Sequence, residues 1–261
     1  MNCLIETALL THGLRSITNE ELAQSWHCPD AILAWVDGGE LKLGPIGEYL
    51  PFRERSEELI RIDCDHLEEA LQTGASGALT ASGTMAVCRR LDIPMAITCG
   101  MGGIGDLRGE ELCPDLPALM NIPVALISTS PKDMLDRPAT LDWLRRHGVH
   151  TAGEPCTGYL FCGKPVALEL PLSSCNNETA VRRLTANGGL LILNPIPEKE
   201  RVQDRSILVD AIKAGKQAEA EGHYYHPAAN GEIDRRTGGY SSRIQLESIQ
   251  QNYLLAKSIM D

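Results

Sequence analysis

GALTASGTMAVCRRLDIPMAITCG, residues 77–100, decides the fold class of this chain. Its two ends, GALTAS and PMAITCG, are short, aliphatic and bounded by glycine or proline, which is the pattern of buried strands. The residues between them have the apolar spacing of a helix. Parallel strands need such a crossover, and the crossover is right-handed in nearly all proteins. The segment therefore predicts an α/β protein with a mostly parallel sheet.

The same alternation extends on both sides of this segment. Further buried strands are predicted at 123–128 (PVALIS) and 188–195 (GGLLILNP), and residues 31–44 (AILAWVDGGELKLG) are typical of a β-hairpin that turns at Asp37-Gly38-Gly39. Helical patterns lie at 65–74, 82–91, 139–148, 176–188, 206–222 and 242–260. No linker or internal repeat divides the chain, so residues 1–261 are predicted to form a single domain.

Composition limits the class of protein and of partner. Hydrophobic residues make up 43% and aromatic residues only 4%, so the core is aliphatic, as suits parallel strands covered by helices on both faces in an α/β/α arrangement. The formal net charge of -11 disfavours binding to a nucleic-acid polymer or an anionic membrane surface. No apolar run of 18 residues and no signal-peptide pattern occurs, which predicts a cytoplasmic protein. The nine cysteines lack a C-x-x-C pair and fit neither a disulfide framework nor a zinc ribbon.

Polar residues follow several of the predicted strands. They are Thr80, Thr98, Ser128 to Ser130 and Asn194. Ligands of parallel sheets bind at the carboxyl ends of the strands, so a small-molecule site is expected at this edge.

Lys132 follows the predicted strand PVALIS and can reach that edge. An ordinary lysine is only about 0.04% neutral at pH 7. To act as a nucleophile it needs burial or a nearby cation that lowers its pKa by roughly 3 units. From the residues alone, a solvated lysine at a helix start remains the simpler interpretation.

Glu6 lies in the apolar run CLIETALL. A carboxyl group among apolar neighbours has a raised pKa and can serve as a general acid. A glutamate on an edge strand that faces water is the alternative.

Glu111 and Asp115 are four residues apart in GEELCPDLPAL. On a helix they would share one face and offer two oxygen ligands to Mg²⁺ or Mn²⁺. Acidic residues are also common in the first turn of any helix, where the macrodipole favours them.

The run TCGMGGIGDLRG (98–109) follows a strand and is rich in glycine. Its backbone N–H groups could hold an anion, with Arg108 beside them. It matches neither the dinucleotide-binding nor the P-loop pattern, so NAD or ATP use is weakly supported. His12, in THGL, is more typical of a structural histidine at a turn than of a ligand or base.

Taken together, these segments resemble the pseudouridine-5′-phosphate glycosidase family, which includes the indigoidine synthase A-like proteins. The matching segments are 6–13 (ETALLTHG), 77–80 (GALT) through 84–85 (TM), 98–104, 123 to 149, 194–198 (NPIPE) and 237–239 (TGG). They occur in the family's order over nearly the whole chain, and no single short motif carries the resemblance.

The resemblance implies an α/β/α fold, usually a homotrimer, and a Mn²⁺-assisted, reversible cleavage of a C–C glycosidic bond to give ribose 5-phosphate and uracil. It implies that Lys132 is the Schiff-base lysine, Glu6 the acid/base glutamate, and Asp115 with Glu111 the carboxylates associated with manganese or another divalent metal. The substrate-binding set that it implies comprises Arg61, Thr80, Ala81, Thr98, Arg108, Cys113 and Gln245.

Four positions depart from the family pattern. Arg61 stands where the family has a second lysine, Gly105 replaces a histidine, Cys113 replaces a serine and Gln245 replaces an asparagine. The reaction-carrying positions thus persist, whereas those around the sugar and phosphate differ. Each lost charge-assisted hydrogen bond is worth roughly 1.5–3 kcal/mol. We therefore expect a nucleoside-type or sugar ligand that need not be pseudouridine 5′-phosphate; the alternatives are a lyase or glycosidase on a different sugar and a catalytically weak ligand-binding homologue.

Overall fold

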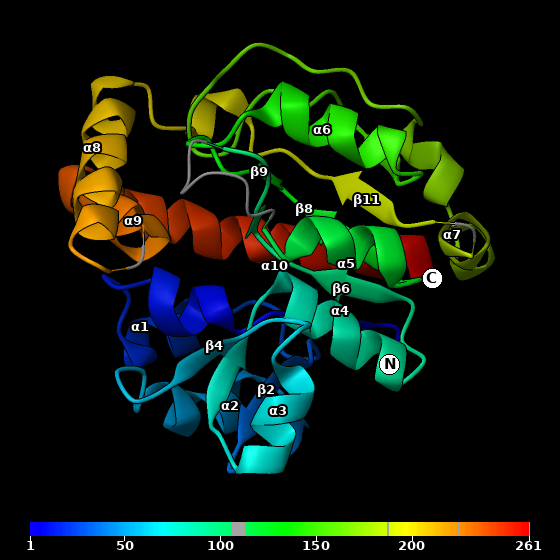
Figure 1. The fold of residues 1–261 in the computed structure, drawn as a ribbon, viewed down its shortest axis with the longest axis horizontal. Helices are drawn as coiled ribbons and strands as arrows, with labels where there is room; N and C mark the ends of the chain where they lie inside the picture. The colour runs from blue at the N-terminus through cyan, green and yellow to red at the C-terminus, as the bar shows by residue number, and fades with distance from the viewer. Residues whose placement is uncertain (106–112, 187, 224, 261) are drawn as a thin grey trace.

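The computed structural model describes residues 1–105, 113–186, 188–223 and 225–260 (Figure 1). Its main sheet has the strand order β10-β11-β8-β6-β1-β2-β5-β4, and β3 pairs with β2 outside this path. The strands of this sheet are β1 (Cys3–Ile5), β2 (Leu33–Asp37), β3 (Glu40–Gly44), β4 (Ile60–Ile62), β5 (Gly77–Leu79), β6 (Met95–Ile97), β8 (Ala125–Ser128), β10 (His150–Gly153) and β11 (Leu190–Leu193). The strands from β10 to β2 along this order are all parallel, whereas β5 runs antiparallel to β2 and carries β4 parallel to itself. The predicted mostly parallel α/β fold is confirmed.

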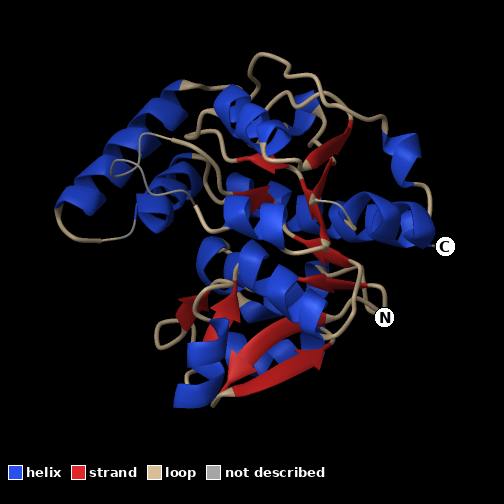
Figure 2. Ribbon diagram, turned by 45° about the vertical axis from the view of Figure 1, so that its right-hand side comes forward, coloured by secondary structure: helices blue, strands red, loops and turns tan. Residues whose placement is uncertain are grey.

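Helices cover both faces of this sheet (Figure 2). They are α1 (Asn19–Ser25), α2 (Ile46–Arg53), α3 (Leu67–Thr73), α4 (Ala81–Arg90), α5 (Asp115–Asn121), α6 (Arg137–Arg146), α7 (Glu178–Thr185), α8 (Ser206–Ala220), α9 (Tyr225–Arg236) and α10 (Tyr240–Met260), with a π-helix η1 (Leu9–Gly13) and 3₁₀ turns η2 (Leu172–Cys175) and η3 (Glu198–Glu200). In Figure 1, α4 and α5 lie in front of the sheet and α10 lies behind it.

Alternation along the central strand explains the two layers. Cys3 and Ile5 belong to one buried cluster, which includes the apolar side of α10, whereas Leu4 belongs to the other, with apolar residues of α4 to α6. Successive side chains of a strand point to opposite faces, so a strand buried on both faces reads as a continuous apolar run. That is why CLI and its neighbours in the sheet have so few polar positions.

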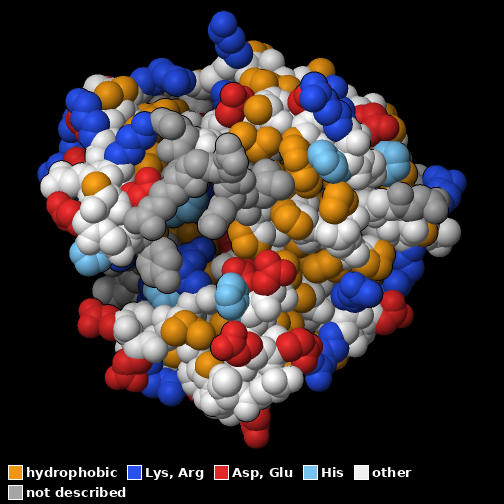
Figure 3. Space-filling model, viewed as in Figure 1, with side chains coloured by type: hydrophobic (Ala, Val, Ile, Leu, Met, Phe, Trp, Pro, Cys, Tyr) orange, Lys and Arg blue, Asp and Glu red, His pale blue; other side chains and the backbone are white. Residues whose placement is uncertain are grey.

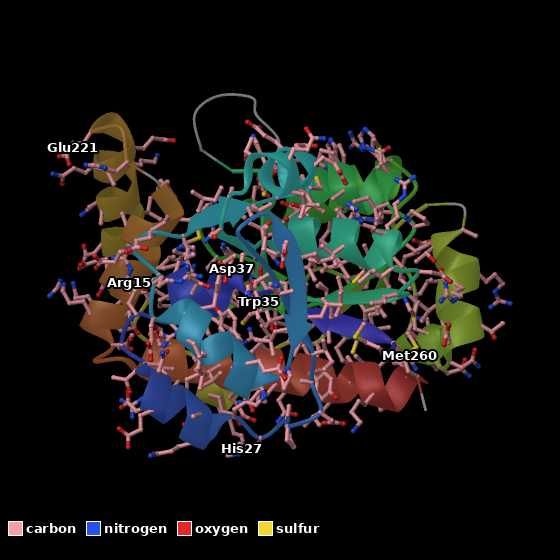
Figure 4. All side chains as sticks on the ribbon, turned by 90° about the horizontal axis from the view of Figure 1, so that it is seen from below. Arg15, His27, Trp35, Asp37, Glu221 and Met260 are labelled. Atoms are coloured by element: carbon pink, nitrogen blue, oxygen red, sulfur yellow. The ribbon has the colours of Figure 1, made fainter. Side chains whose placement is uncertain are left out.

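The predicted hairpin forms as β2 and β3, with Asp37 opposite Glu40. Gly38 and Gly39 both have positive φ, at 61° and 77°. A two-residue turn with positive φ at both positions matches the right-handed twist of a hairpin, and glycine adopts it without strain. In the view of Figure 4, Trp35 and Asp37 lie on this ribbon.

Several elements differ from the sequence prediction. The segment GALTAS is a strand only as far as Leu79, because Thr80 is already the N-cap of α4 and its hydroxyl accepts a hydrogen bond from the Gly83 N–H. The short strands β4 and β10 and the helix α9 were not predicted. A three-residue strand gives almost no periodic signal, and α9 contains Pro227 and Gly231 in a polar stretch.

Among the described residues, none of the helices combines the length and the apolar character that a membrane crossing requires. This agrees with the absence of a long apolar run in the sequence.

Candidate active site

Three of the predicted polar residues come together where neighbouring strands end. Glu6 follows β1 and its N–H donates to the Ile97 carbonyl, while Thr98 follows β6 and its N–H donates to the Ile127 carbonyl. Lys132 follows a two-stranded parallel sheet made of β7 (Gly100–Met101) and β9 (Ser130–Pro131), which extends beyond β6 and β8. The site therefore lies at the carboxyl edge of the parallel strands, as the sequence predicts.

Glu6 is buried, with 6% of its surface exposed. The Thr98 hydroxyl donates a hydrogen bond of 2.6 Å to Glu6 Oε1. Burial raises the pKa of the Glu6 carboxyl from 4.5 to about 7, although the Thr98 hydrogen bond and the charges of Lys132 and Arg61 act in the opposite direction. A carboxyl group with this pKa is partly protonated at neutral pH and can donate a proton. The edge-strand alternative for Glu6 does not describe this environment, because β1 is central.

Lys132 has the environment that the sequence argument required. Burial is the main cause of its lowered pKa, and the positive charge of Arg61 is the second; Glu6, Cys113 and Asp115 partly oppose them. The residue as a whole is half-buried, so the lysine is not a solvated one. Burial thus favours the neutral amine at Lys132 and the neutral acid at Glu6.

The residue after the lysine anchors this segment. Asp133 accepts hydrogen bonds from three successive backbone N–H groups, those of Tyr159 at 2.9 Å, Leu160 at 2.6 Å and Phe161 at 2.9 Å. Arg137 lies 3.8 Å from the same carboxylate. The chain that carries Lys132 is therefore fixed against the 159–161 loop rather than free to move.

Asp115 joins two parts of the site. It is 7% exposed, and it accepts hydrogen bonds from the Ser82 N–H at 3.1 Å through Oδ1 and from the Gly102 N–H at 2.8 Å through Oδ2. Ser82 lies in the first turn of α4, where backbone N–H groups have no partner within the helix. Asp115 thus ties the start of α4 to the glycine-rich loop.

The glycine-rich loop packs closely. A Cβ at Gly102 would lie 2.0 Å from Cys113 Sγ, and a Cβ at Gly103 would lie 2.6 Å from Thr140 Oγ1. The same Thr140 hydroxyl accepts a hydrogen bond from the Ile104 N–H. Two amide groups of the loop are thus already bonded within the protein, and those two cannot hold an anion as the sequence suggested.

Arg61 lies on β4 and its side chain is exposed. Its charge lowers the pKa of Lys132, His12 and His226, after the larger effect of burial on each. Burial raises the pKa of the Cys113 thiol to about 12, so Cys113 is a neutral, half-buried neighbour of this cluster.

Two further predicted residues have structural roles at the start of α4. The Thr80 hydroxyl caps α4 and lies 3.2 Å from the Ser82 hydroxyl. Ala81 is buried, with 3% exposure. Both line the helix start that Asp115 also contacts.

Gln245 reaches the site through another residue. Its Oε1 accepts a hydrogen bond of 3.0 Å from the Tyr159 hydroxyl, and its Nε2 donates to the Ser241 carbonyl. Tyr159 packs over Gly100, where a Cβ would lie 2.7 Å from the ring. Asn252 lies two turns further along α10. Its side chain donates a hydrogen bond of 2.7 Å to the Thr98 carbonyl and so supports the residue that contacts Glu6.

Two histidines border the cluster. His12 Nε2 is 3.0 Å from the Leu59 carbonyl, which fixes Nε2 as the donor, and its Nδ1 is buried without a partner among the described residues. This agrees with the structural role predicted for His12. Arg53 holds the π-helix that carries His12, because its guanidinium donates to the carbonyls of Leu10, Leu14 and Ile17.

His226, on α9, was not singled out in the sequence, and neither were Tyr159 and Asp133. Its Nδ1 is also buried without a partner in the described part of the chain. Burial lowers the pKa of His226 from 6.5 to about 2, and the charges of Lys132 and then Arg61 contribute. Nothing in the local pattern of YYHPAANGEI indicates that this helix lies at the sheet edge.

The predicted metal ligands are only partly described. Glu111 lies outside the described residues, as does Arg108. Within the ranges that the structure describes, no group of three His, Cys, Asp or Glu side chains could hold a metal ion. Of the two predicted ligands only Asp115 is described, and each of its oxygens keeps a lone pair beyond the one hydrogen bond that it accepts from a described residue. One carboxylate with waters is a donor set that Mg²⁺ or Mn²⁺ accepts.

Figure 3 shows a hollow in this face of the molecule, in which basic and histidine side chains gather close to acidic ones. Mixed charge in a concave region is common at sites for polar small molecules.

The chain is similar in sequence to proteins of one family. The model of a family described as indigoidine synthase A like protein matches residues 4–260. The chain is 28% identical to a pseudouridine-5′-phosphate glycosidase of Methylobacterium nodulans, over 98% of this chain and 81% of that protein. It is 26% identical to a pseudouridine-5′-phosphate glycosidase of Escherichia coli, over 98% of this chain and 88% of that protein.

Two crystal structures share the fold. The prealnumycin C-glycosynthase AlnA, solved in complex with ribulose 5-phosphate, has a TM-score of 0.78 at 21% identity and covers 98% of this chain and 90% of its own. An indigoidine synthase A (IdgA)-like protein from Thermotoga maritima has a TM-score of 0.74 at 18% identity, and the match covers 98% of this chain and 91% of that protein.

Proposed function

The chain belongs to the indigoidine synthase A-like family, and we propose that it is a C-glycosidase, which cleaves or reversibly forms the C–C bond between ribose and base in pseudouridine 5′-phosphate or a related C-glycosyl compound. The observation that carries this proposal is the pairing of Glu6 and Lys132 in one buried cluster. The names of the curated relatives support the choice of reaction.

The physical difficulty of this reaction matches what the cluster offers. A carbon atom of a base is a poor leaving group, so protonation and departure, as for an O-glycoside, is difficult. A covalent lysine adduct divides the reaction into easier steps. The amine has to be neutral to attack, and burial with the adjacent Arg61 favours that state.

We infer that Glu6 is the acid. It would protonate the sugar ring oxygen, so that the ring opens and C1′ accepts the lysine nitrogen. The resulting Glu6 carboxylate would take the proton that the lysine nitrogen loses on bonding to C1′ and deliver it to the carbon of the base, so that the C–C electron pair can leave with the base. Its pKa of about 7 suits a group that gives and regains protons near neutral pH.

Lys132 would complete the cleavage. As the C–C bond breaks, the lone pair of the lysine nitrogen forms a C=N bond to C1′, and water later adds to this iminium and releases the free sugar and the amine. The atoms balance as C-nucleotide plus water giving ribose 5-phosphate plus uracil. Asp133 contributes by holding the segment that carries the lysine.

For the divalent metal, Asp115 would be a ligand, with Glu111 as the second predicted carboxylate. Bound there, Mn²⁺ would supply positive charge that polarises oxygens of the ligand. The family resemblance also supports a homotrimer in the cytoplasm, which light scattering of the purified protein and cell fractionation would test.

The identity of the ligand's charged end is a separate part of the proposal. Arg61 would grip a phosphate with a planar fork of donors rather than with the point charge of a lysine. The guanidinium of Arg61 differs in shape from the lysine of the family pattern, and Gln245, which replaces an asparagine, accepts a hydrogen bond from Tyr159. Both differences support a sugar or phosphate recognition that differs from that of the family.

A panel of substrates tests the function. With Mn²⁺ present, the protein is incubated with pseudouridine 5′-phosphate, pseudouridine and other C-glycosyl compounds, and free base is quantified by chromatography. Borohydride is added in parallel, and the mass of the peptide that contains Lys132 is measured. We expect base release and a sugar adduct on Lys132 with at least one compound, and neither in a Lys132→Met variant. Base release that persists in Lys132→Met would refute the lysine mechanism.

A further inference from the structure

The Nδ1 atom of His226 is buried and has no hydrogen-bond partner among the described residues. Of the buried side-chain N and O atoms without a partner in the described part of the chain, two belong to arginines and two are the Nδ1 atoms of His12 and His226. An unsatisfied buried polar group is costly, and native proteins rarely keep one without a role. His12 has its other ring nitrogen bonded to the Leu59 carbonyl, whereas no side-chain hydrogen bond joins His226 to another described residue.

The hairpin of α8 and α9 determines where this ring points. Tyr225, the preceding residue, packs on Gly215 of α8, where a Cβ would lie 2.7 Å from the ring. The rings of Tyr225 and His226 meet edge to face, with centroids 5.5 Å apart and an angle of 87°. Tyr225 thus packs on α8, and α9 also packs against η1, which begins at Leu9, three residues after Glu6. In Figure 4 the end of α8, labelled at Glu221, projects from the body of the molecule beside the turn that leads to α9.

The electrostatic neighbours of the ring show which part of the site it faces. Lys132 has the largest charge effect on His226, and Arg61 the next. The ring therefore lies within electrostatic reach of both cations. Burial and these two cations keep the pKa of His226 far below neutrality, so the ring is neutral and can donate one hydrogen bond and accept another.

We propose that His226 is a ligand-contacting residue of this site, which forms a hydrogen bond to a hydroxyl group of the sugar next to the carbon that Lys132 captures. A hydroxyl group suits a neutral imidazole because either partner can donate. A phosphate, by contrast, would be matched by the permanent charge of Arg61. This inference rests on the proposed function, since it assumes that a sugar binds at Lys132.

The test compares two sugars and three variants in the full chain. His226→Leu removes both nitrogens at similar volume, His226→Gln keeps a donor and an acceptor, and His223→Leu removes an exposed histidine from the same hairpin. The dissociation constants of ribose 5-phosphate and of ribose are measured by calorimetry, the sugar adduct on Lys132 is measured after borohydride, and thermal unfolding is followed for each protein.

We expect His226→Leu to bind both sugars about 3- to 10-fold more weakly, as for one neutral hydrogen bond, and to form the adduct correspondingly less at subsaturating sugar. His226→Gln should recover most of the affinity, and His223→Leu should match the parent. Because the leucine removes an unsatisfied buried group, the midpoint of thermal unfolding should stay equal or rise.

Two results would overturn the inference while the proposed function stands. One is a parent protein that forms the adduct and a His226→Leu variant that binds both sugars equally well. The other is weakening confined to ribose 5-phosphate, which would assign His226 to the phosphate. A parent protein that binds neither sugar and forms no adduct would instead refute the proposed function itself. A large fall in thermal stability of His226→Leu would show a structural role and also contradict the inference.

Discussion

Thr98→Val should move the alkaline limb of the activity profile to higher pH. The Thr98 hydroxyl donates its 2.6 Å hydrogen bond to Glu6, and this bond lowers the pKa of the carboxyl because it favours the charged form. A hydrogen bond to a charged group is worth about 1.5–3 kcal/mol, and 1.36 kcal/mol corresponds to one pKa unit. Losing the bond should therefore raise the pKa of Glu6 by about 1–2 units. In the proposed mechanism Glu6 acts in its protonated form, so activity should persist to higher pH by the same amount.

The assay is the pH dependence of kcat/KM for base release, measured from pH 5 to 10 with a substrate that the panel identifies. Thr98→Ser is the matched control, because it keeps the hydroxyl and the backbone carbonyl that Asn252 contacts. Its alkaline limb should coincide with that of the parent. An unmoved limb in Thr98→Val would show that this bond does not tune the acid, and a shift to lower pH would show that Glu6 is not the group that must be protonated.

Three further results are expected. Glu6→Gln should remove a pH dependence of stability, because the pKa of Glu6 is raised from 4.5 to about 7 in the folded protein and the parent therefore loses stability as pH rises through that window. Measured by urea unfolding, the free energy of unfolding of the variant should gain about 3 kcal/mol relative to the parent between pH 4 and pH 8. Equal pH slopes for the two proteins would contradict this. Arg53→Met should lower the free energy of unfolding by at least about 3 kcal/mol in the same assay, because three carbonyls lose the hydrogen bonds that the guanidinium donates. Arg53→Lys should be intermediate. A loss under about 1 kcal/mol would show that water replaces the guanidinium. Asp133→Asn should lower kcat roughly 10- to 100-fold, because Lys132 would be misplaced. Circular dichroism should show that the variant is folded. An unchanged kcat would show that the 159–161 loop does not position the lysine.

The fold was readable from the sequence wherever strands are aliphatic and bounded by Gly or Pro. The segments at 77–100, 123–128 and 188–195 became β5, β6, β8 and β11, and the turn at Gly38 and Gly39 formed where the glycines predicted it. The strands β4 and β10 could not be read, because short segments with exposed or small side chains take their conformation from their neighbours in the sheet.

The candidate site could be predicted from the sequence at Glu6 and Lys132, and less so in their surroundings. A carboxyl in an apolar run and a lysine after a strand were sufficient to nominate Glu6 and Lys132, and the family resemblance strengthened both. His226 and Tyr159 could not be nominated, because their relevance comes from where α9 and the 159–161 loop lie in space. Asp115 is predicted as a metal ligand, but its hydrogen bonds from the Ser82 and Gly102 N–H groups depend on how α4 and the glycine-rich loop pack, which no local pattern indicates.

The central position of β1 has a consequence for how the protein folds. The strand at Cys3–Ile5 pairs along its whole length with β6, about ninety positions later in the chain, and α10 covers it at the very end. The pairing of β1 therefore depends on contacts that are distant in sequence, which makes folding slow. A chain in which this sheet has not assembled leaves Glu6 in water, so its carboxyl acquires the raised pKa only when burial is complete.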